Sequence, residues 1–111
     1  MDNKDYILNM AKQIITEEAE KAGCKVEAIY LFGSRARGDY KEDSDFDFYV
    51  IIDKNIERKI KINIAGNIRR KLRIRLNISS DIIIQSMSAV NERINDIGYL
   101  TYYALKEGVP I

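Results

Sequence analysis

Two short, almost uninterrupted apolar runs constrain the fold of this chain more than any other feature. The first extends from Ile29 to Phe32 and the second from Phe48 to Ile52. Short apolar runs bounded by glycine or polar residues are typical of strands that are covered by other elements. We therefore predict strands over residues 25–32 and 45–52, joined by a polar segment, 35–44, in which Gly38 is a turn residue.

Two longer segments have the spacing of amphipathic helices that could cover such strands. Residues 3–22 place Ile7, Ala11 and Ile14 at helical intervals, and Gly23 is suited to end the helix. Residues 55–76 repeat an apolar side chain every fourth residue. The repeated residues are Ile56, Ile60, Ile64, Ile68, Leu72 and Leu76.

The remaining segments predict one more strand and one more helix. The strand covers residues 78–86, and the helix runs from a cap at Ser88 to about Glu107, before Gly108. The side chains expected to face inward are Val90, Ile94, Ile97, Leu100 and Ala104. The predicted order is helix, strand, strand, helix, strand, helix. This is an α/β (α+β) fold with a small mixed β-sheet flanked by helices, in one domain over residues 1–111.

Composition excludes several kinds of chemistry. The 111 residues include no histidine and one cysteine, Cys24, to which we assign no role. Histidine-dependent nucleophile systems, cysteine-rich zinc sites and intrachain disulfides are therefore excluded. The N-terminus lacks a signal-peptide pattern and no apolar run would span a membrane, so we expect a cytoplasmic protein. Any chemistry must use carboxylates, hydroxyls, Lys or Arg, or a hard metal ion.

The segment 33–47 carries the candidate site. Gly33-Ser34 directly follows a predicted strand, where a glycine allows close approach of a ligand and the turn can direct N–H groups and a hydroxyl toward phosphate. Arg35 and Arg37 lie in the same turn and could support that turn or add positive charge for phosphate.

Paired aspartates follow at the start of the second strand. Asp45 and Asp47 would point to the same face of the strand, with their Cα atoms about 7 Å apart, and a divalent cation would relieve the repulsion between their carboxylates. Oxygen ligands favour Mg²⁺ or Mn²⁺. Asp81 opens the third strand and would complete a set of three carboxylates if that strand lies beside the second. Such a set suits two-metal phosphoryl or nucleotidyl transfer. Asp96 is the alternative third acid.

Gly33-Ser34, then ten residues, then Asp45-x-Asp47 resembles the DNA polymerase β-like nucleotidyltransferase superfamily. The fuller form, Gly-Ser-Arg-Ala-Arg-Gly followed by Ser-Asp-x-Asp, is similar to the minimal nucleotidyltransferases (MNT) of HEPN/MNT toxin–antitoxin systems. The resemblance extends over nearly the whole chain, including residues 104–109 near its end. It implies the polymerase β-like fold.

The resemblance also implies an activity and a partner. Such proteins transfer a nucleoside monophosphate from a nucleoside triphosphate to a hydroxyl. Gly33 and Ser34 would hold the triphosphate of ATP, and Asp45, Asp47 and Asp81 would bind two Mg²⁺ ions, for which Mn²⁺ can substitute. The expected function is an antitoxin that transfers AMP to a tyrosine of a HEPN ribonuclease toxin, within a hetero-oligomeric complex. The alternative is a catalytically silent antitoxin that neutralises its toxin by binding alone.

Two other functions have weaker support in the sequence. Residues 54–75 carry nine of the eighteen Lys and Arg residues against Glu57 alone. A solvated helix face is the ordinary explanation; an acidic partner, nucleotide phosphates or RNA are the functional ones. The net charge of +1 and the lack of a nucleic-acid motif make RNA the least favoured partner. The second alternative is an antibiotic- or tRNA-modifying nucleotidyltransferase. Such enzymes usually carry an added substrate domain, for which we expect no room in these 111 residues. Tyr99, Tyr102 and Tyr103 are expected to serve as core or partner-facing aromatics.

Overall fold

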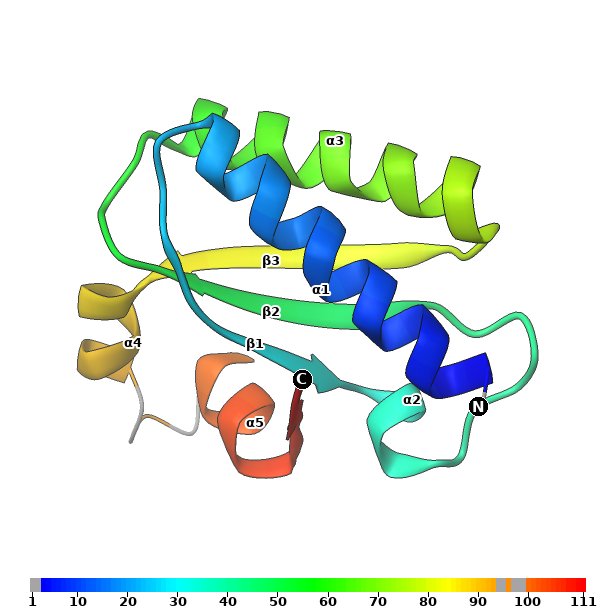
Figure 1. Cartoon of the computed structure of the whole chain (residues 1–111). Helices are drawn as coiled ribbons and strands as arrows, with labels where there is room; N and C mark the ends of the chain where they lie inside the picture. The colour runs from blue at the N-terminus through cyan, green and yellow to red at the C-terminus, as the bar shows by residue number, and fades with distance from the viewer. Residues whose placement is uncertain (1–2, 94–95, 97–99) are drawn as a thin grey trace.

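A computed structural model describes residues 3–93, 96 and 100–111. Its elements follow in the order shown in Figure 1. They are α1 (Asn3–Lys21), β1 (Val26–Phe32), α2 (Ser34–Arg37), β2 (Phe46–Ile52), α3 (Arg58–Leu76), β3 (Ser80–Ser86), α4 (Met87–Arg93), α5 (Leu100–Glu107) and β4 (Val109–Pro110). The three main strands and the first two long helices confirm the predicted segments to within a few residues.

The strands form one mixed sheet in the order β3-β2-β1-β4. Strands β1 and β2 are antiparallel, as their short connection allows, and β4 is antiparallel to β1. The pair β2 and β3 is parallel, because α3 provides the long crossover that parallel strands require. The mixed α/β fold predicted from the sequence is confirmed.

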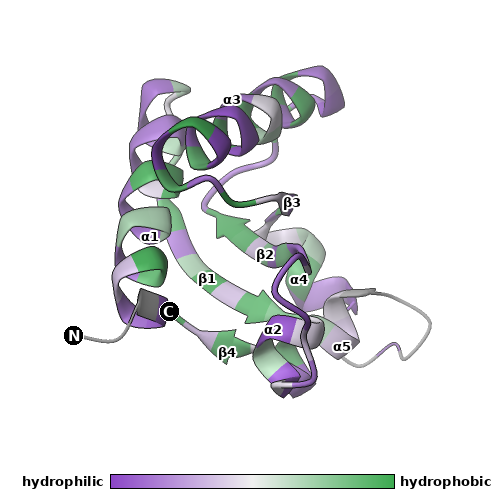
Figure 2. Cartoon of the chain, turned by 90° about the vertical axis from the view of Figure 1, so that its right-hand side faces the viewer, coloured by the Kyte–Doolittle hydropathy of each residue, from purple (hydrophilic) through white to green (hydrophobic). Residues whose placement is uncertain are grey.

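Helices cover the two faces of the sheet, as Figure 2 shows along its edge. Helices α1 and α3 pack on the face that carries Phe46, Phe48 and Val50, which are all buried. Helices α4 and α5 lie on the other face, where Tyr49 is buried and its hydroxyl hydrogen-bonds to the hydroxyl of Thr101 in α5. Because strand side chains alternate, consecutive residues of β2 belong to different cores.

The prediction of one continuous helix over 88–107 is wrong. The structure has α4 and α5 in its place, and Asp96 between them is not helical. Asn95, Asp96 and Gly98 all have low helix propensity, which opposes a continuous helix there. The predicted inward positions Ile94 and Ile97, the side chain of Leu100 and Tyr99 lie outside the described residues; Val90 and Ala104 are buried as predicted.

Three smaller features also differ from expectation. Helix α2 is one helical turn that overlaps the start of the segment predicted as a short polar connection. Strand β4 has two residues, which pair with β1. Ile60 was predicted to face the core but is 40% exposed, whereas Ile64, Ile68 and Leu72 are buried. Among the described helices, none is long and apolar enough to cross a membrane.

Candidate active site

The parallel pairing of β2 and β3 brings the predicted carboxylates together. Asp47 lies directly opposite Asp81 in the register of the two strands. Adjacent strands are about 4.8 Å apart, so these two side chains are neighbours. Asp45 immediately precedes β2, and its charge acts on Asp47. Asp47 and Asp81 alternate with Phe46, Phe48 and Ile82, which belong to the core under α1 and α3, so the acids point to the opposite face.

Asp47 is the acid that the fold perturbs most clearly. It is half-buried, whereas Asp45 and Asp81 are exposed. Burial raises the pKa of the Asp47 carboxyl above its usual value of 3.8, and the negative charges of Asp81 and Asp45 raise it further. The positive charge of Arg37 opposes this rise. The positive charge near Asp47 is thus too small to cancel the effects of burial and of the neighbouring acids on its pKa.

The donor set fits a hard divalent cation. Three aspartates provide oxygen ligands. A cation would offset both the repulsion between their charges and the cost of burying the Asp47 carboxylate, which together raise the pKa of Asp47. Within the described part of the chain, however, no three side chains of the metal-binding types are already arranged to hold an ion. To hold one ion together, the carboxylates would have to turn toward one another.

Gly33 lies against Asp47 at the end of β1. A Cβ atom built on Gly33 would be 2.3 Å from Oδ2 of Asp47, far inside van der Waals contact. Its backbone angles, φ 73° and ψ −157°, lie in a region that only glycine adopts readily. The glycine therefore permits both the turn out of β1 and the close approach to the acid.

Helix α2 begins at Ser34 directly after this glycine. The N–H groups of Ala36 and Arg37 donate to the carbonyl of Gly33, and Gly38, with φ 89°, ends the turn with its N–H on the carbonyl of Ser34. The predicted phosphate-binding pair Gly33 and Ser34 therefore lies beside the acidic pair, at the adjoining ends of β1 and β2.

The two arginines of the turn have different surroundings. Arg37 is exposed and pairs with Asp39 at 3.4 Å, and its charge acts on Asp47. The guanidinium of Arg35 instead donates to the carbonyls of Glu42 and Ser44. The two arginines were predicted together, but the fold separates them. Tyr40, whose ring lies against Arg35, was not singled out from the sequence because its contact depends on loop conformation.

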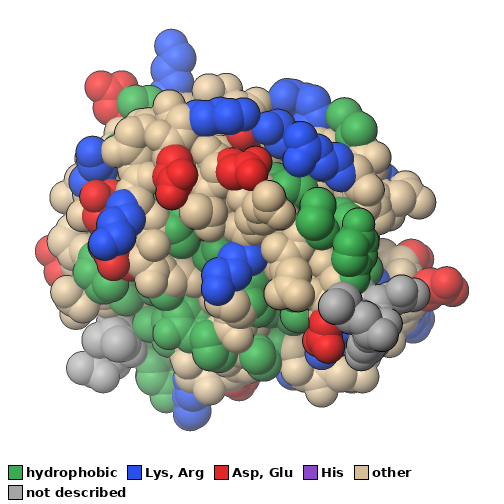
Figure 3. All heavy atoms as spheres, viewed as in Figure 1, with side chains coloured by type: hydrophobic (Ala, Val, Ile, Leu, Met, Phe, Trp, Pro, Cys, Tyr) green, Lys and Arg blue, Asp and Glu red, His purple; other side chains and the backbone are tan. Residues whose placement is uncertain are grey.

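Other predicted residues lie apart from these contacts or are described only in part. Asp96, the alternative third acid, is exposed between α4 and α5. Tyr102 and Tyr103 pack edge to face, and Tyr103 is exposed. Figure 3 shows basic side chains along α3 at the upper margin of that view. One of them, Lys71, forms an ion pair with buried Glu18.

Comparison with known proteins identifies the family. The family described as "Polymerase beta, Nucleotidyltransferase" matches residues 11–108. A Methanocaldococcus jannaschii protein named "Putative protein adenylyltransferase MJ0604" is 30% identical over 84 residues, which cover 76% of this chain and 78% of that protein. A second protein of that organism, with the same name but numbered MJ0141, is 37% identical over 60 residues, 54% of this chain and 56% of that protein.

Solved structures show the same fold. A Sulfolobus solfataricus protein described as a putative nucleotidyltransferase has a TM-score of 0.57 at 28% identity, and the match covers 82% of this chain and 76% of that chain. A chain from a toxin–antitoxin structure with AMP-PNP has a TM-score of 0.53 at 20% identity, over 88% of this chain and 69% of that chain. The family match, which extends over most of the sequence, confirms the resemblance seen in the motif. The chain belongs to the polymerase beta nucleotidyltransferase family and is a nucleotidyltransferase.

Proposed function

We propose that this nucleotidyltransferase transfers AMP from ATP to a hydroxyl of a partner protein in a Mg²⁺-dependent reaction. The observation that carries the proposal is the placement of the Gly33-Ser34 turn against Asp47, with Asp81 opposite Asp47 on the next strand. A phosphate-binding turn beside three carboxylates is the equipment that nucleotidyl transfer requires.

Each residue of this group has a proposed part in the reaction. Asp45 and Asp47 would hold the metal ions, and Asp81 would supply the third carboxylate, as a ligand or as the acceptor of the proton. Bound Mg²⁺ would neutralise triphosphate charge and lower the pKa of the acceptor hydroxyl. Gly33 and Ser34 hold the triphosphate through N–H and hydroxyl groups. The acceptor hydroxyl gives its proton to Asp81 or to water, and its oxygen bonds to the α-phosphorus. The bond from that phosphorus to the bridging oxygen breaks, and pyrophosphate leaves.

The proposed acceptor is a tyrosine of a HEPN ribonuclease toxin, which this chain would silence as an antitoxin in a hetero-oligomeric complex. Three findings support this choice. The motif resembles the minimal nucleotidyltransferases, a relative at 30% identity is named as a protein adenylyltransferase, and the fold matches chains of toxin–antitoxin structures. The exposed carboxylates of Asp45 and Asp81 leave the site open to a large acceptor.

Intact-mass spectrometry tests the proposal. The protein encoded beside this one is incubated with the chain, Mg²⁺ and each nucleoside triphosphate in turn. We expect a mass increase by whole AMP units with ATP, on a tyrosine located by peptide mapping. The increase should disappear with EDTA and in the Asp45→Asn, Asp47→Asn double variant.

Other outcomes would redirect the proposal. A tight complex without a mass increase would favour an antitoxin that acts by binding alone, and the double variant would then still protect cells from the toxin. Transfer of a different nucleotide would overturn the choice of ATP but preserve the reaction class. The absence of both a complex and AMP transfer would overturn the proposed partner.

A further inference from the structure

The described hydrogen bonds of the Arg35 guanidinium all go to the loop that leads to the candidate metal ligands. Its Nη2 donates to the carbonyl of Glu42 at 2.8 Å and to that of Ser44 at 3.0 Å, and its Nε donates to Ser44 at 3.2 Å. Ser44 is the residue before Asp45. One side chain therefore fixes the backbone immediately ahead of the first carboxylate.

Two aromatic rings hold the same guanidinium in place. Its Cζ lies 4.2 Å from the centre of the Tyr40 ring and 4.3 Å from that of Phe46. Tyr40 belongs to the loop, and Phe46 is the first residue of β2. A planar guanidinium can contact rings while its N–H groups donate in its own plane, whereas a lysine ammonium cannot reproduce this arrangement.

The position of Phe46 places Arg35 behind the acids. Phe46 is 5% exposed and belongs to the core under α1 and α3. Asp47, the next residue, points to the opposite face of β2. Arg37, by contrast, is near enough for its charge to oppose the rise in the pKa of Asp47.

The loop has few other internal restraints. Its described hydrogen bonds include the N–H of Ser44 to the carbonyl of Lys41 at 3.0 Å, and the N–H of Lys41 to the hydroxyl of Ser44 at 2.9 Å. These bonds close a local turn but do not attach the loop to the sheet. Arg35, which starts from α2 and packs on Phe46 of β2, joins the loop to both elements, and Arg37 of α2 adds an exposed ion pair to Asp39.

We infer that Arg35 is a positioning residue that sets Asp45 and Asp47 from behind β2, and that it does not contact the nucleotide. This inference rests on the proposed function for its kinetic consequence, but not for its structural one. Loss of Arg35 frees the loop, so the metal ligands must be ordered when the metal binds. The chemical step then suffers more than nucleotide binding does.

The first test measures the loop without any activity. Amide hydrogen exchange is compared between the wild type, Arg35→Met, Arg35→Lys and the matched control Arg37→Met. We expect faster exchange over residues 40–47 in both Arg35 variants. In Arg37→Met we expect no change over 40–47, and any change should be confined to Asp39, with which Arg37 pairs. Unchanged exchange in Arg35→Met would overturn the inference. If Arg35→Met does not fold, Tyr40→Leu removes one ring of the contact and should give a smaller increase over the same residues.

The second test separates positioning from nucleotide contact. Mn²⁺ binding is followed by electron paramagnetic resonance, and AMP transfer is measured over a range of ATP concentrations. We expect Arg35→Met and Arg35→Lys to weaken Mn²⁺ binding and lower kcat by about tenfold, with little change in the KM for ATP. A raised KM with unchanged Mn²⁺ affinity would assign Arg35 to the nucleotide and overturn the inference. If the wild type transfers no AMP, the proposed function fails, while hydrogen exchange still decides the role of Arg35.

Discussion

At the residue scale, the tightest point of the site is the contact between Gly33 and Asp47. The glycine adopts a positive φ, and any side chain there would meet the carboxylate. Two separate physical terms, backbone strain and steric overlap, therefore select glycine at this position. The same closeness places the predicted triphosphate-binding turn against the acid whose pKa is raised.

We expect Gly33→Ala to lower transfer activity by at least tenfold, because the new Cβ displaces the Asp47 carboxylate. The backbone strain should also cost on the order of 1–3 kcal/mol of unfolding free energy. Gly66→Ala is the matched control, because Gly66 is helical and has open space around it, so it should stabilise the chain slightly. Urea unfolding and transfer assays measure both effects. An active Gly33→Ala variant would show that the turn is not part of the site.

Asp47 also predicts a pH dependence of stability. Its pKa is raised in the folded state, so the folded chain binds this proton more tightly than the unfolded chain does. Stability from this group is therefore present below the usual value of 3.8 and is lost as the pH rises through the higher folded value. The Asp47→Asn substitution removes this loss of stability at higher pH, because asparagine does not ionise. In EDTA at neutral pH we expect the variant to be more stable than the wild type.

Urea unfolding over a pH series with and without Mg²⁺ checks this prediction. Mg²⁺ should stabilise the wild type by binding only the folded chain, and should have a much smaller effect on Asp47→Asn. Equal stabilisation of both proteins by Mg²⁺ would contradict a metal site at Asp47.

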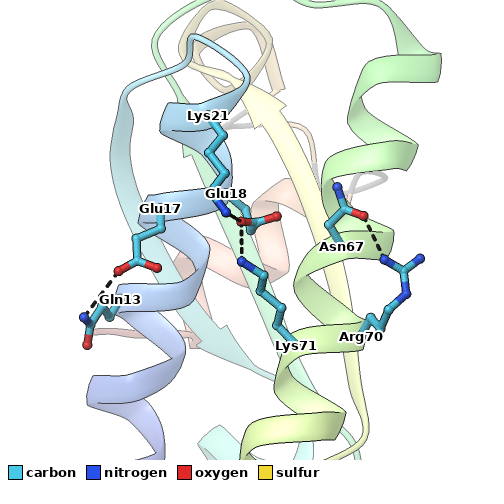
Figure 4. Close-up of polar contacts among 7 residues, drawn as sticks. All are labelled: Gln13, Glu17, Glu18, Lys21, Asn67, Arg70 and Lys71. Carbon is cyan, nitrogen blue, oxygen red and sulfur yellow. Dashed lines mark hydrogen bonds and ion pairs between the residues drawn. The ribbon is translucent and has the colours of Figure 1, made fainter.

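At the element scale, a buried ion pair joins α1 to α3. Glu18 is 7% exposed, and Lys71 and Lys21 contact its Oε2 at 2.9 and 3.0 Å (Figure 4). The hydrogen bond from Lys71 is the main reason that the pKa of Glu18 is lowered, and Lys21 adds to the effect. Stability from Glu18 is thus present above its usual value of 4.5 and is lost as the pH falls through the lower folded value.

We expect Lys71→Met to destabilise the chain by about 1–3 kcal/mol, because it removes the better-placed partner of a buried carboxylate. Arg70→Met is the matched control on the same helix. Arg70 makes only an exposed hydrogen bond to Asn67, so its loss should cost less than about 0.5 kcal/mol. Chemical denaturation at neutral pH measures both. Equal losses in the two variants would mean that the pair does not hold the helices together.

The element scale also shows where sequence patterns succeed. Ile64, Ile68 and Leu72 recur every fourth residue and are all buried, because one face of α3 lies on the sheet. The helical pattern failed over 88–107, where the apolar spacing continued across residues of low helix propensity. Strand β4 left little pattern, since its two residues are strand only through pairing with β1.

At the scale of the whole molecule, charge is uneven although the total is nearly balanced. Nine of eighteen basic residues lie in 54–75, mainly on α3, while the acids of the site lie on the opposite face of the sheet. Helix α3 thus packs on the side of the sheet opposite to the acids, but its Arg73 lines a pocket together with Arg35 and Ser44, the residue before Asp45.

We expect this chain to bind single-stranded RNA only weakly and with strong salt dependence. Its Kd should lie in the range of non-specific binding, about 10⁻⁶–10⁻⁴ M. Fluorescence anisotropy at physiological salt measures this affinity. Arg69→Glu with Arg70→Glu should leave Mn²⁺ binding unchanged, because both residues belong to α3 rather than to the strands that carry the acids. Tighter RNA binding that the double variant abolishes would favour a nucleic-acid function.

The features of this protein that depend on near neighbours along the chain could be predicted without its structure. The glycine-serine turn, the two apolar strands and the pair Asp45 and Asp47 could be read directly, because turn chemistry and strand alternation are local. That Asp81 lies opposite Asp47 could not be predicted in the same way, since it depends on the parallel register of β2 and β3 across a long crossover. The different surroundings of Arg35, which donates to the loop carbonyls, and Arg37, whose charge acts on Asp47, also come from the folded chain, because contacts within an irregular loop leave no periodic pattern in the sequence.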